Sequence, residues 1–111
     1  MKKIEAIIKP FKVEEVRDAL SEIGIDGMTM SEVKGLIGQV DRAELKGHES
    51  YFDYLPKVKI EVVVNDGRAQ EAVDAILKGA RTGKNGETKI FVTRIDQVVR
   101  IRTEERNELA I

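Results

Sequence analysis

The feature that most constrains this chain is an internal repeat. Lys3–Leu20 (KIEAIIKPFKVEEVRDAL) aligns without a gap with Lys59–Ile76 (KIEVVVNDGRAQEAVDAI), and both copies begin with Lys-Ile-Glu. In the first copy, apolar residues alternate over Ile4–Ile8 and then recur at helical spacing from Val13 to Ile23, the pattern of a half-buried strand followed by an amphipathic helix. The second copy has a near-continuous apolar strand, a turn at Asn-Asp-Gly and a second helical stripe. The repeat therefore predicts two strand–helix units.

Each copy is followed by a further segment that is typical of a strand, Met28–Gly35 after the first and Lys89–Ile95 after the second. The resulting order, β-α-β-β-α-β, predicts the α+β class and a ferredoxin-like double βαβ sandwich, in which one antiparallel sheet is covered by two helices. Pro10 and Gly24 mark the start and end of the first helix. The tail segment VVRIRT predicts one more strand.

A long connection, Gly35–Lys57, separates the second and third predicted strands. A hairpin needs only about 2 to 5 loop residues, so most of this segment is an excursion, and excursions of this kind carry contacts with other molecules. The alternative is that Leu45–Leu55 only extends the hairpin, because Tyr51, Phe52 and Tyr54 suit strands.

Composition narrows the classes of function. The 111 residues fit a single domain, and 19 Lys and Arg nearly balance 20 Asp and Glu, so no direct nucleic-acid partner and no electrostatic membrane binding is expected. The absence of Cys excludes a disulfide framework and a thiolate metal site. The first apolar run ends at Lys9-Pro10 and is too short for a signal or membrane-spanning segment, so we expect a cytoplasmic protein.

Local cationic groups suggest an anion site. The glycine-rich segment Ala80–Lys89 (ARTGKNGETK) can direct backbone N–H groups and lysines toward a phosphate, although it lacks the Walker A spacing. Arg100 and Arg102 would share one face of the tail strand. Together with Lys57 and Lys89 they make a polyphosphate site plausible; the alternative is a solvated or salt-bridged edge.

Blocks along nearly the whole chain resemble the PII signal-transduction family: MKKIEAIIKPFK, GMTMSEVKG, LPKVKIEVVV, ARTGK, KIFV and VVRIRT occur in family order and spacing. This resemblance implies a single PII-like domain over residues 1–111 that forms a homotrimer and binds ATP or ADP at each intersubunit cleft. It also implies a T-loop at about residues 36–55 that engages a target protein, such as a membrane transporter or a metabolic enzyme. The family's main role is regulatory rather than enzymatic.

The resemblance also assigns residues. It implies that the base of the nucleotide and the phosphates are bound within one subunit by Ile7, Gly35, Glu61, Val63, Gly86, Glu87, Thr88 and Lys89, and that the neighbouring subunit contributes Gly27, Met28, Thr29, Arg100 and Arg102. Gln39 would be the ligand of an ATP-bound Mg²⁺. Lys57 would pair with a carboxylate of 2-oxoglutarate, beside Gln39 and Gly86.

The chain departs from the family pattern mainly in its long loop. Asp41 stands where the family has a glycine next to 2-oxoglutarate, so its charge predicts weak or absent binding of that dianion. Thr88 replaces a glycine of the phosphate turn. The loop is one residue shorter, which puts Ser50 at the modifiable position and displaces Tyr51 by one. His48 is the only histidine, and we assign no metal site to it.

Three readings of the function follow. The first is a nucleotide-dependent sensor of nitrogen, carbon or energy status that regulates a target through the T-loop. The second is a divergent sensor that answers to a small anion other than 2-oxoglutarate, with a target other than the ammonium channel. The third, an ATP-hydrolysing enzyme, is disfavoured because no general base is evident near the proposed phosphates. We expect a family sensor with a divergent T-loop.

Overall fold

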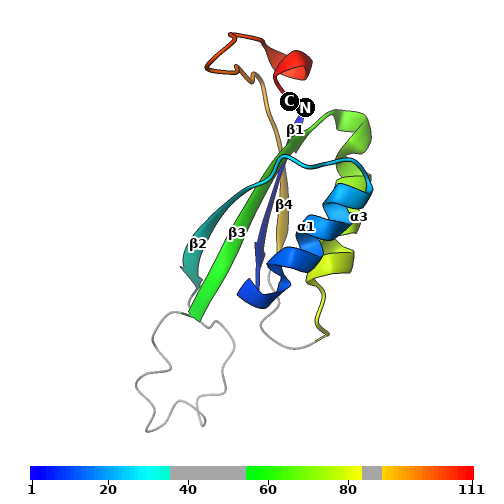
Figure 1. Cartoon of the computed structure of the whole chain (residues 1–111), viewed down its shortest axis with the longest axis vertical. Coiled ribbons are helices and arrows are strands. Elements are labelled where there is room, and N and C mark those ends of the chain that lie inside the picture. The colour runs from blue at the N-terminus through cyan, green and yellow to red at the C-terminus, as the bar shows by residue number, and fades with distance from the viewer. Residues whose placement is uncertain (36–54, 84–88) are drawn as a thin grey trace, which may run out of the picture.

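The computed structural model describes residues 1–35, 55–83 and 89–111, and within them the chain forms one sheet with two helices on one face (Figure 1). The antiparallel sheet has the strand order β2-β3-β1-β4. Its strands are β1 (Lys2–Ile8), β2 (Thr29–Gly35), β3 (Leu55–Val64) and β4 (Ile90–Arg94). The helices are α1 (Val13–Glu22) and α3 (Ala69–Ala80), with short 3₁₀ turns η1 (Pro10–Lys12), η3 (Asp66–Arg68) and η4 (Asn107–Ala110).

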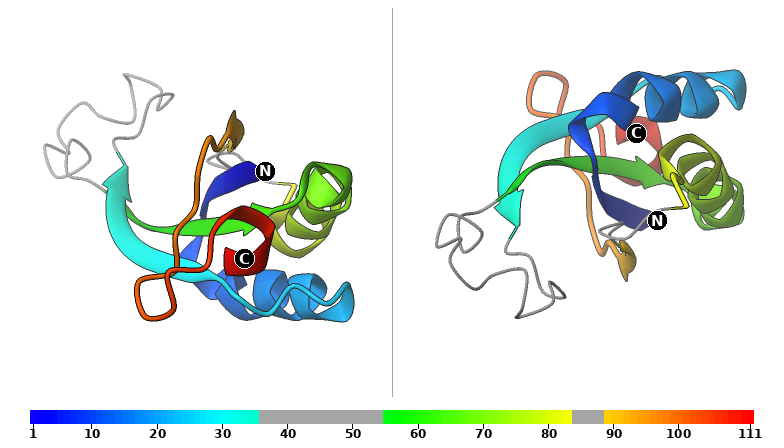
Figure 2. Two further views of the ribbon diagram at one scale, coloured as in Figure 1. Left: turned by 90° about the horizontal axis from the view of Figure 1, so that it is seen from above. Right: turned by 90° about the horizontal axis from the view of Figure 1, so that it is seen from below.

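This arrangement confirms the double βαβ fold that the repeat predicts. β1 and β3, the first strands of the two copies, are neighbours at the centre of the sheet, and α1 and α3 lie side by side across it (Figure 2). The four predicted strands and both helices are present within a few residues of the expected bounds.

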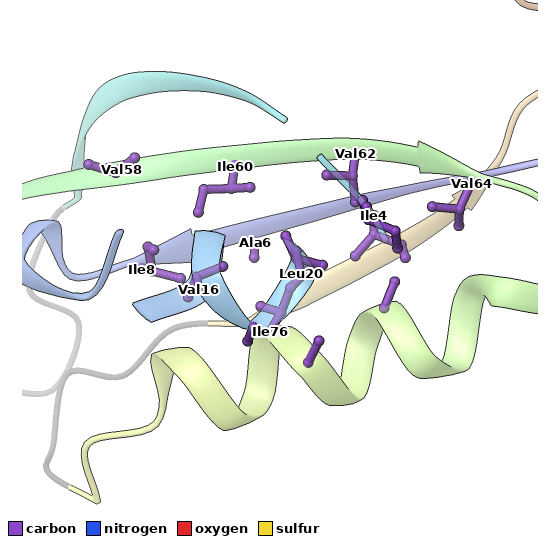
Figure 3. Close-up of a cluster of buried hydrophobic side chains, with 14 residues drawn as sticks. Ile4, Ala6, Ile8, Val16, Leu20, Val58, Ile60, Val62, Val64 and Ile76 are labelled. Carbon is purple, nitrogen blue, oxygen red and sulfur yellow. The ribbon is translucent and has the colours of Figure 1, made fainter. Parts of the chain in front are cut away.

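The core lies between the sheet and the helices. Side chains alternate between the two faces of each strand, and this alternation decides which of them enter the core. In β1, Ile4, Ala6 and Ile8 are buried while the intervening residues are not. Their partners on β3 are also buried, because directly paired residues of an antiparallel ladder share a face. Figure 3 shows these side chains, together with Val58, Ile60, Val62 and Val64 of β3, facing residues of both helices, namely Val16, Leu20 and Ile76.

The two helices approach each other closely at Gly79. A Cβ atom built on Gly79 would lie 2.7 Å from the Cα of Val16 and 2.8 Å from the carbonyl oxygen of Glu15, which are both backbone atoms of α1. Real Cβ atoms do not reach such distances, so glycine is the residue that lets the backbones of α1 and α3 meet at this point.

The turns that join strands and helices also follow local chemistry. Gly24 follows α1 with φ of +80°, a left-handed conformation that glycine adopts without steric cost, and it confirms the predicted helix end. The Asn-Asp-Gly turn before the second helix becomes the 3₁₀ turn η3. There the N-terminal ammonium lies 2.8 Å from Oδ1 of Asp66, and this contact lowers the pKa of the Asp66 carboxyl.

The prediction of a tail strand is wrong. Of residues 98–103, only Val99 makes a β-bridge, to Arg106, and residues 101–103 form a turn. The apolar alternation of VVRIRT is strand-like, but a strand also needs a partner, and in the described chain the tail pairs only with itself. Arg100 and Arg102 therefore do not share one face of a strand.

Different segments of the chain gather at the two ends of the sheet (Figure 1). Both termini, residues 23–28, η3 and the tail lie at one end, which we call the upper end. The other end, the lower end, holds η1, the C-terminal end of α3, the finish of β2 and the start of β3. Among the described residues, no helix is long and apolar enough to cross a membrane.

The close helix contact yields a first prediction. Gly79→Ala should lower the free energy of unfolding by about 1 to 3 kcal/mol, because the added methyl group meets backbone atoms that can move apart only together with the helix. Urea unfolding at fixed protein concentration measures this. Gly67→Ala is the control, since a Cβ there meets no atom within 4 Å, and it should change stability by less than about 0.5 kcal/mol.

Candidate functional site

A cavity of about 570 Å³ lies at the upper end of the sheet. The loop after α1, the C-terminal half of β3 and the chain's own tail form its walls. We call it the upper cavity; the residues that line it are Gly24, Ile25, Asp26, Gly27, Thr29, Glu61, Val62, Val63, Val64, Asn65, Arg68, Val98, Arg100, Glu108, Ala110 and Ile111. It brings together five of the predicted nucleotide-binding residues, namely Gly27, Thr29, Glu61, Val63 and Arg100.

Strand pairing explains why these residues meet. Thr29 begins β2 and lies directly opposite Glu61 on β3, so their side chains share the sheet face that the helices do not cover. Glu61 also lies opposite Glu5 of β1. The repulsion between these two carboxylates is offset by lysines on the same strands: Lys59 Nζ lies 3.4 Å from Glu61 Oε1, and Lys3 Nζ lies 4.0 Å from Glu5 Oε1.

The upper cavity carries charge of both signs. Arg68 is held in place by donating hydrogen bonds to the Glu71 carboxylate and to the carbonyl oxygen of Ile23. Arg100 lies across from it on the tail, where Nε is 3.8 Å from Oε1 of Glu105 and Nη2 donates to the carbonyl oxygen of Ala110 at 3.4 Å. Asp26, Glu61 and Glu108 also line the cavity, so an anionic ligand would have to bind beside the two guanidinium groups.

The lower end holds a second group of predicted residues. A small cavity of about 80 Å³, the lower cavity, lies between β1, β4 and the end of α3. Its lining includes Ile7, Lys9, Arg81 and Lys89. Gly35, the last residue of β2, and Lys57 of β3 also lie at this end.

Lys57 has an unusual environment for a lysine, since it is only 9% exposed. Its burial, and secondly the positive charge of Lys9, lower the pKa of the Lys57 ammonium from its usual value of 10.5. Both effects disfavour the charged form. An anionic group beside Lys57 would oppose both effects.

The two groups of residues lie toward opposite ends of the sheet. Lys57 and Val63 are on the same strand, and at about 3.3 Å per residue they are roughly 20 Å apart. In the single chain, Glu61 and Val63 line the upper cavity with Gly27 and Thr29, and Ile7 lies opposite Lys59, two residues from Glu61 along β3. The assignment of these residues to one subunit or to its neighbour remains a prediction.

Besides Gly35 and Lys57, two more of the described predicted residues line neither cavity. Met28 packs against the core and lines a smaller cavity of about 140 Å³ beside α1. Arg102 lies exposed in the tail turn. Gln39, Asp41, His48, Ser50, Tyr51, Gly86, Glu87 and Thr88 lie outside the described residues, as does the proposed T-loop between β2 and β3, so the predictions about them remain predictions.

Sequence reasoning missed four charged residues of this region. Asp26, Arg68 and Glu108 line the upper cavity, and Glu105 pairs with Arg100. No local pattern marks Arg68, because its proximity to Ile23 arises only when α3 packs beside α1. Over the described ranges, no group of three His, Cys, Asp or Glu residues could hold a metal ion.

An uncovered sheet face, a duplicated strand–helix unit and a cavity at each end define a small ferredoxin-like domain. Residues 1–105 match the family described as "Nitrogen regulatory protein P-II". The chain belongs to the PII family, whose members are regulatory signalling proteins.

Individual relatives agree with this assignment. The chain is 54% identical to the nitrogen regulatory protein P-II of Pasteurella multocida and to nitrogen regulatory protein P-II 1 of Escherichia coli K12, over 112 aligned residues and 100% of each chain. Among solved structures, Arabidopsis thaliana PII bound to citrate superposes with a TM-score of 0.83 at 37% identity, covering 99% of this chain and 91% of that one.

The environment of Lys57 yields a second prediction. Because its pKa is lower in the folded than in the unfolded chain, the charged side chain costs stability at neutral pH. That cost disappears as the pH rises from the folded-state pKa toward 10.5, since the folded protein then releases its proton first. Lys57→Met should therefore stabilise the protein at pH 7, and the gain should shrink by pH 10.

Urea unfolding of both proteins at the two pH values, without added ligands, measures this effect. Lys59→Met is the matched control, because Lys59 is the next lysine on β3 and is 32% exposed beside Glu61. A gain from Lys57→Met that stays constant between pH 7 and pH 10 would contradict the assignment.

Proposed function

We propose that this protein is a PII-type sensor that binds ATP or ADP between subunits and regulates a target protein through the segment between β2 and β3. The observation that supports the proposal is the upper cavity, which Arg100 lines together with four more of the residues that the resemblance assigns to a nucleotide. Other residues of that set lie outside this cavity, and we propose that they join it from a second chain. A contact between two different surfaces of the subunit forms a ring when the rotation between subunits closes.

The uncovered sheet face supports assembly into a homotrimer. It carries apolar side chains of β1, β2, β3 and β4 among the Lys–Glu pairs, including Phe91, which is 46% exposed. Further apolar residues are exposed on the tail, with Ile101 at 97% and Leu109 at 72%. Apolar surface of this extent, set among charged groups, is typical of an interface between subunits.

Light scattering tests the assembly. We expect a species of three times the 12.5 kDa chain mass at micromolar concentration. A stable monomer would contradict both the trimer and the shared nucleotide site, because neither end of the chain contains the complete set of residues.

In the shared site, the arginines of the tail bind the nucleotide phosphates and Lys89 approaches them from the other subunit. Ile7, Glu61 and Val63 line the base region from that other subunit, and Gly27, Met28 and Thr29 accompany the tail arginines. Lys57 and Lys9 favour a small anion beside the phosphates, and Gln39 would supply the protein ligand of an ATP-bound Mg²⁺. The chain supplies binding and positioning, and we assign it no catalytic residue.

The second effector is a small carboxylate. The lowered pKa of Lys57 supports this, and the citrate bound to Arabidopsis thaliana PII shows a carboxylate ligand on a related fold. 2-Oxoglutarate is the family candidate, but Asp41 would repel it: two like charges about 4 Å apart at an effective dielectric constant of 20 cost about 4 kcal/mol. We therefore propose that ATP binds by itself and that 2-oxoglutarate adds little.

Calorimetry with ATP and ADP tests the nucleotide site. Arg100→Ala and Arg102→Ala should each weaken ATP binding by about 1.5 to 3 kcal/mol, the range for hydrogen bonds to charged groups, while the trimer persists. Arg94→Ala is the control, because Arg94 is exposed at the end of β4 and lines neither cavity.

Unchanged ATP affinity in both tail variants would show that these arginines do not bind the phosphates and only form surface ion pairs. The same titrations repeated with Mg²⁺ and 2-oxoglutarate test the second effector. Strong saturable binding of 2-oxoglutarate to the Mg-ATP-loaded protein would contradict the proposed effect of Asp41.

A further inference from the structure

We propose that Glu105 is an internal competitor for the phosphate-binding guanidinium of Arg100, so that nucleotide binding has to displace it. This inference rests on the proposed function, since it concerns the same anion site. It adds a residue that the resemblance to the family does not assign. The contact between Arg100 Nε and Glu105 Oε1, at 3.8 Å, carries it.

The tail turn holds the two side chains in this position. The backbone N–H of Arg100 donates to the carbonyl oxygen of Glu105 at 2.9 Å, and the N–H of Glu104 donates back to the carbonyl oxygen of Arg100 at 2.8 Å. The hydroxyl of Thr103 donates to Oε1 of Glu105 at 2.7 Å, which orients the carboxylate toward the arginine. The pair is therefore a consequence of the turn geometry and not a chance meeting of long side chains.

The tail uses one arginine donor that a phosphate would need and places a carboxylate beside another. Arg100 Nη2 donates to the carbonyl oxygen of Ala110 at 3.4 Å, so Nε and Nη2 both face acceptors of the chain itself. A phosphate binds arginine through such paired N–H groups. If the Glu105 carboxylate stayed in place, it would also lie close to the incoming phosphate and repel it. Binding is therefore an exchange of one anion for another.

The exposure of the pair sets the size of the effect. Arg100 and Glu105 side chains are 47% and 44% exposed, so water screens their attraction and the competition is modest. Neutralising Glu105 should tighten ATP binding by about two- to fivefold, the range that corresponds to a weak surface ion pair. A much larger gain is not expected.

Isothermal titration of the assembled protein with ATP, at one ionic strength, tests this. Glu105→Gln removes the charge but keeps an oxygen that can accept from Thr103, and it should bind ATP about two- to fivefold more tightly than wild type. Glu104→Gln is the matched control: the charge change is identical, the residue is adjacent, and Glu104 makes no ion pair within the described part of the chain. It should leave the affinity near the wild-type value.

A double-mutant cycle with Arg100→Ala isolates the pair. In the Arg100→Ala background, Glu105→Gln should have no effect, because the group for which Glu105 competes is gone. Equal gains from Glu105→Gln and Glu104→Gln, or weaker binding by Glu105→Gln, would overturn the inference while the wild-type titration still supports the nucleotide site. Absence of binding in wild type and in every variant would overturn the proposed function and this inference together.

Discussion

The register between β1 and β3 is the interaction on which the rest of the structure depends. It places Ile4 opposite Val62 and Ala6 opposite Ile60 on the face that the helices cover, and Glu5 opposite Glu61 on the other face. A slip of one residue would exchange the two faces, because side chains alternate along a strand. The burial of Ile4, Ala6 and Ile60 therefore fixes the register. The placement of Glu61 and Val63 in the upper cavity follows from the same register.

The helices impose a second constraint through their mutual contact. Gly79, near the end of α3, lets its backbone meet that of α1 at Val16, near the start of α1. The start of α3 therefore lies beside the end of α1. Arg68 can then reach the carbonyl oxygen of Ile23, and one wall of the upper cavity is formed. Packing in the core and the charge of the candidate site are linked by this short series of contacts.

The tail pairs its own charged and polar groups and also lines the candidate binding site. Its turn pairs Arg100 with Glu105, which agrees with the salt-bridged alternative that the sequence leaves open. The same arginine lines the upper cavity opposite Arg68. These two findings are compatible because the ion pair is half exposed and weak, so a more highly charged anion can replace the carboxylate.

The sequence by itself determined the fold of this protein, and it identified the family through blocks that extend along nearly the whole chain. The repeat can be found by aligning the chain with itself. The alternation in Ile4–Ile8 and the helix end at Gly24 are patterns of neighbouring residues, which the sequence alone also shows. Only the tertiary structure decided which of the predicted binding residues lie together at each end of the sheet, because that depends on strand direction and order. It also decided that the tail forms a turn rather than a strand, since a strand-like pattern becomes a strand only where a neighbouring edge accepts its hydrogen bonds.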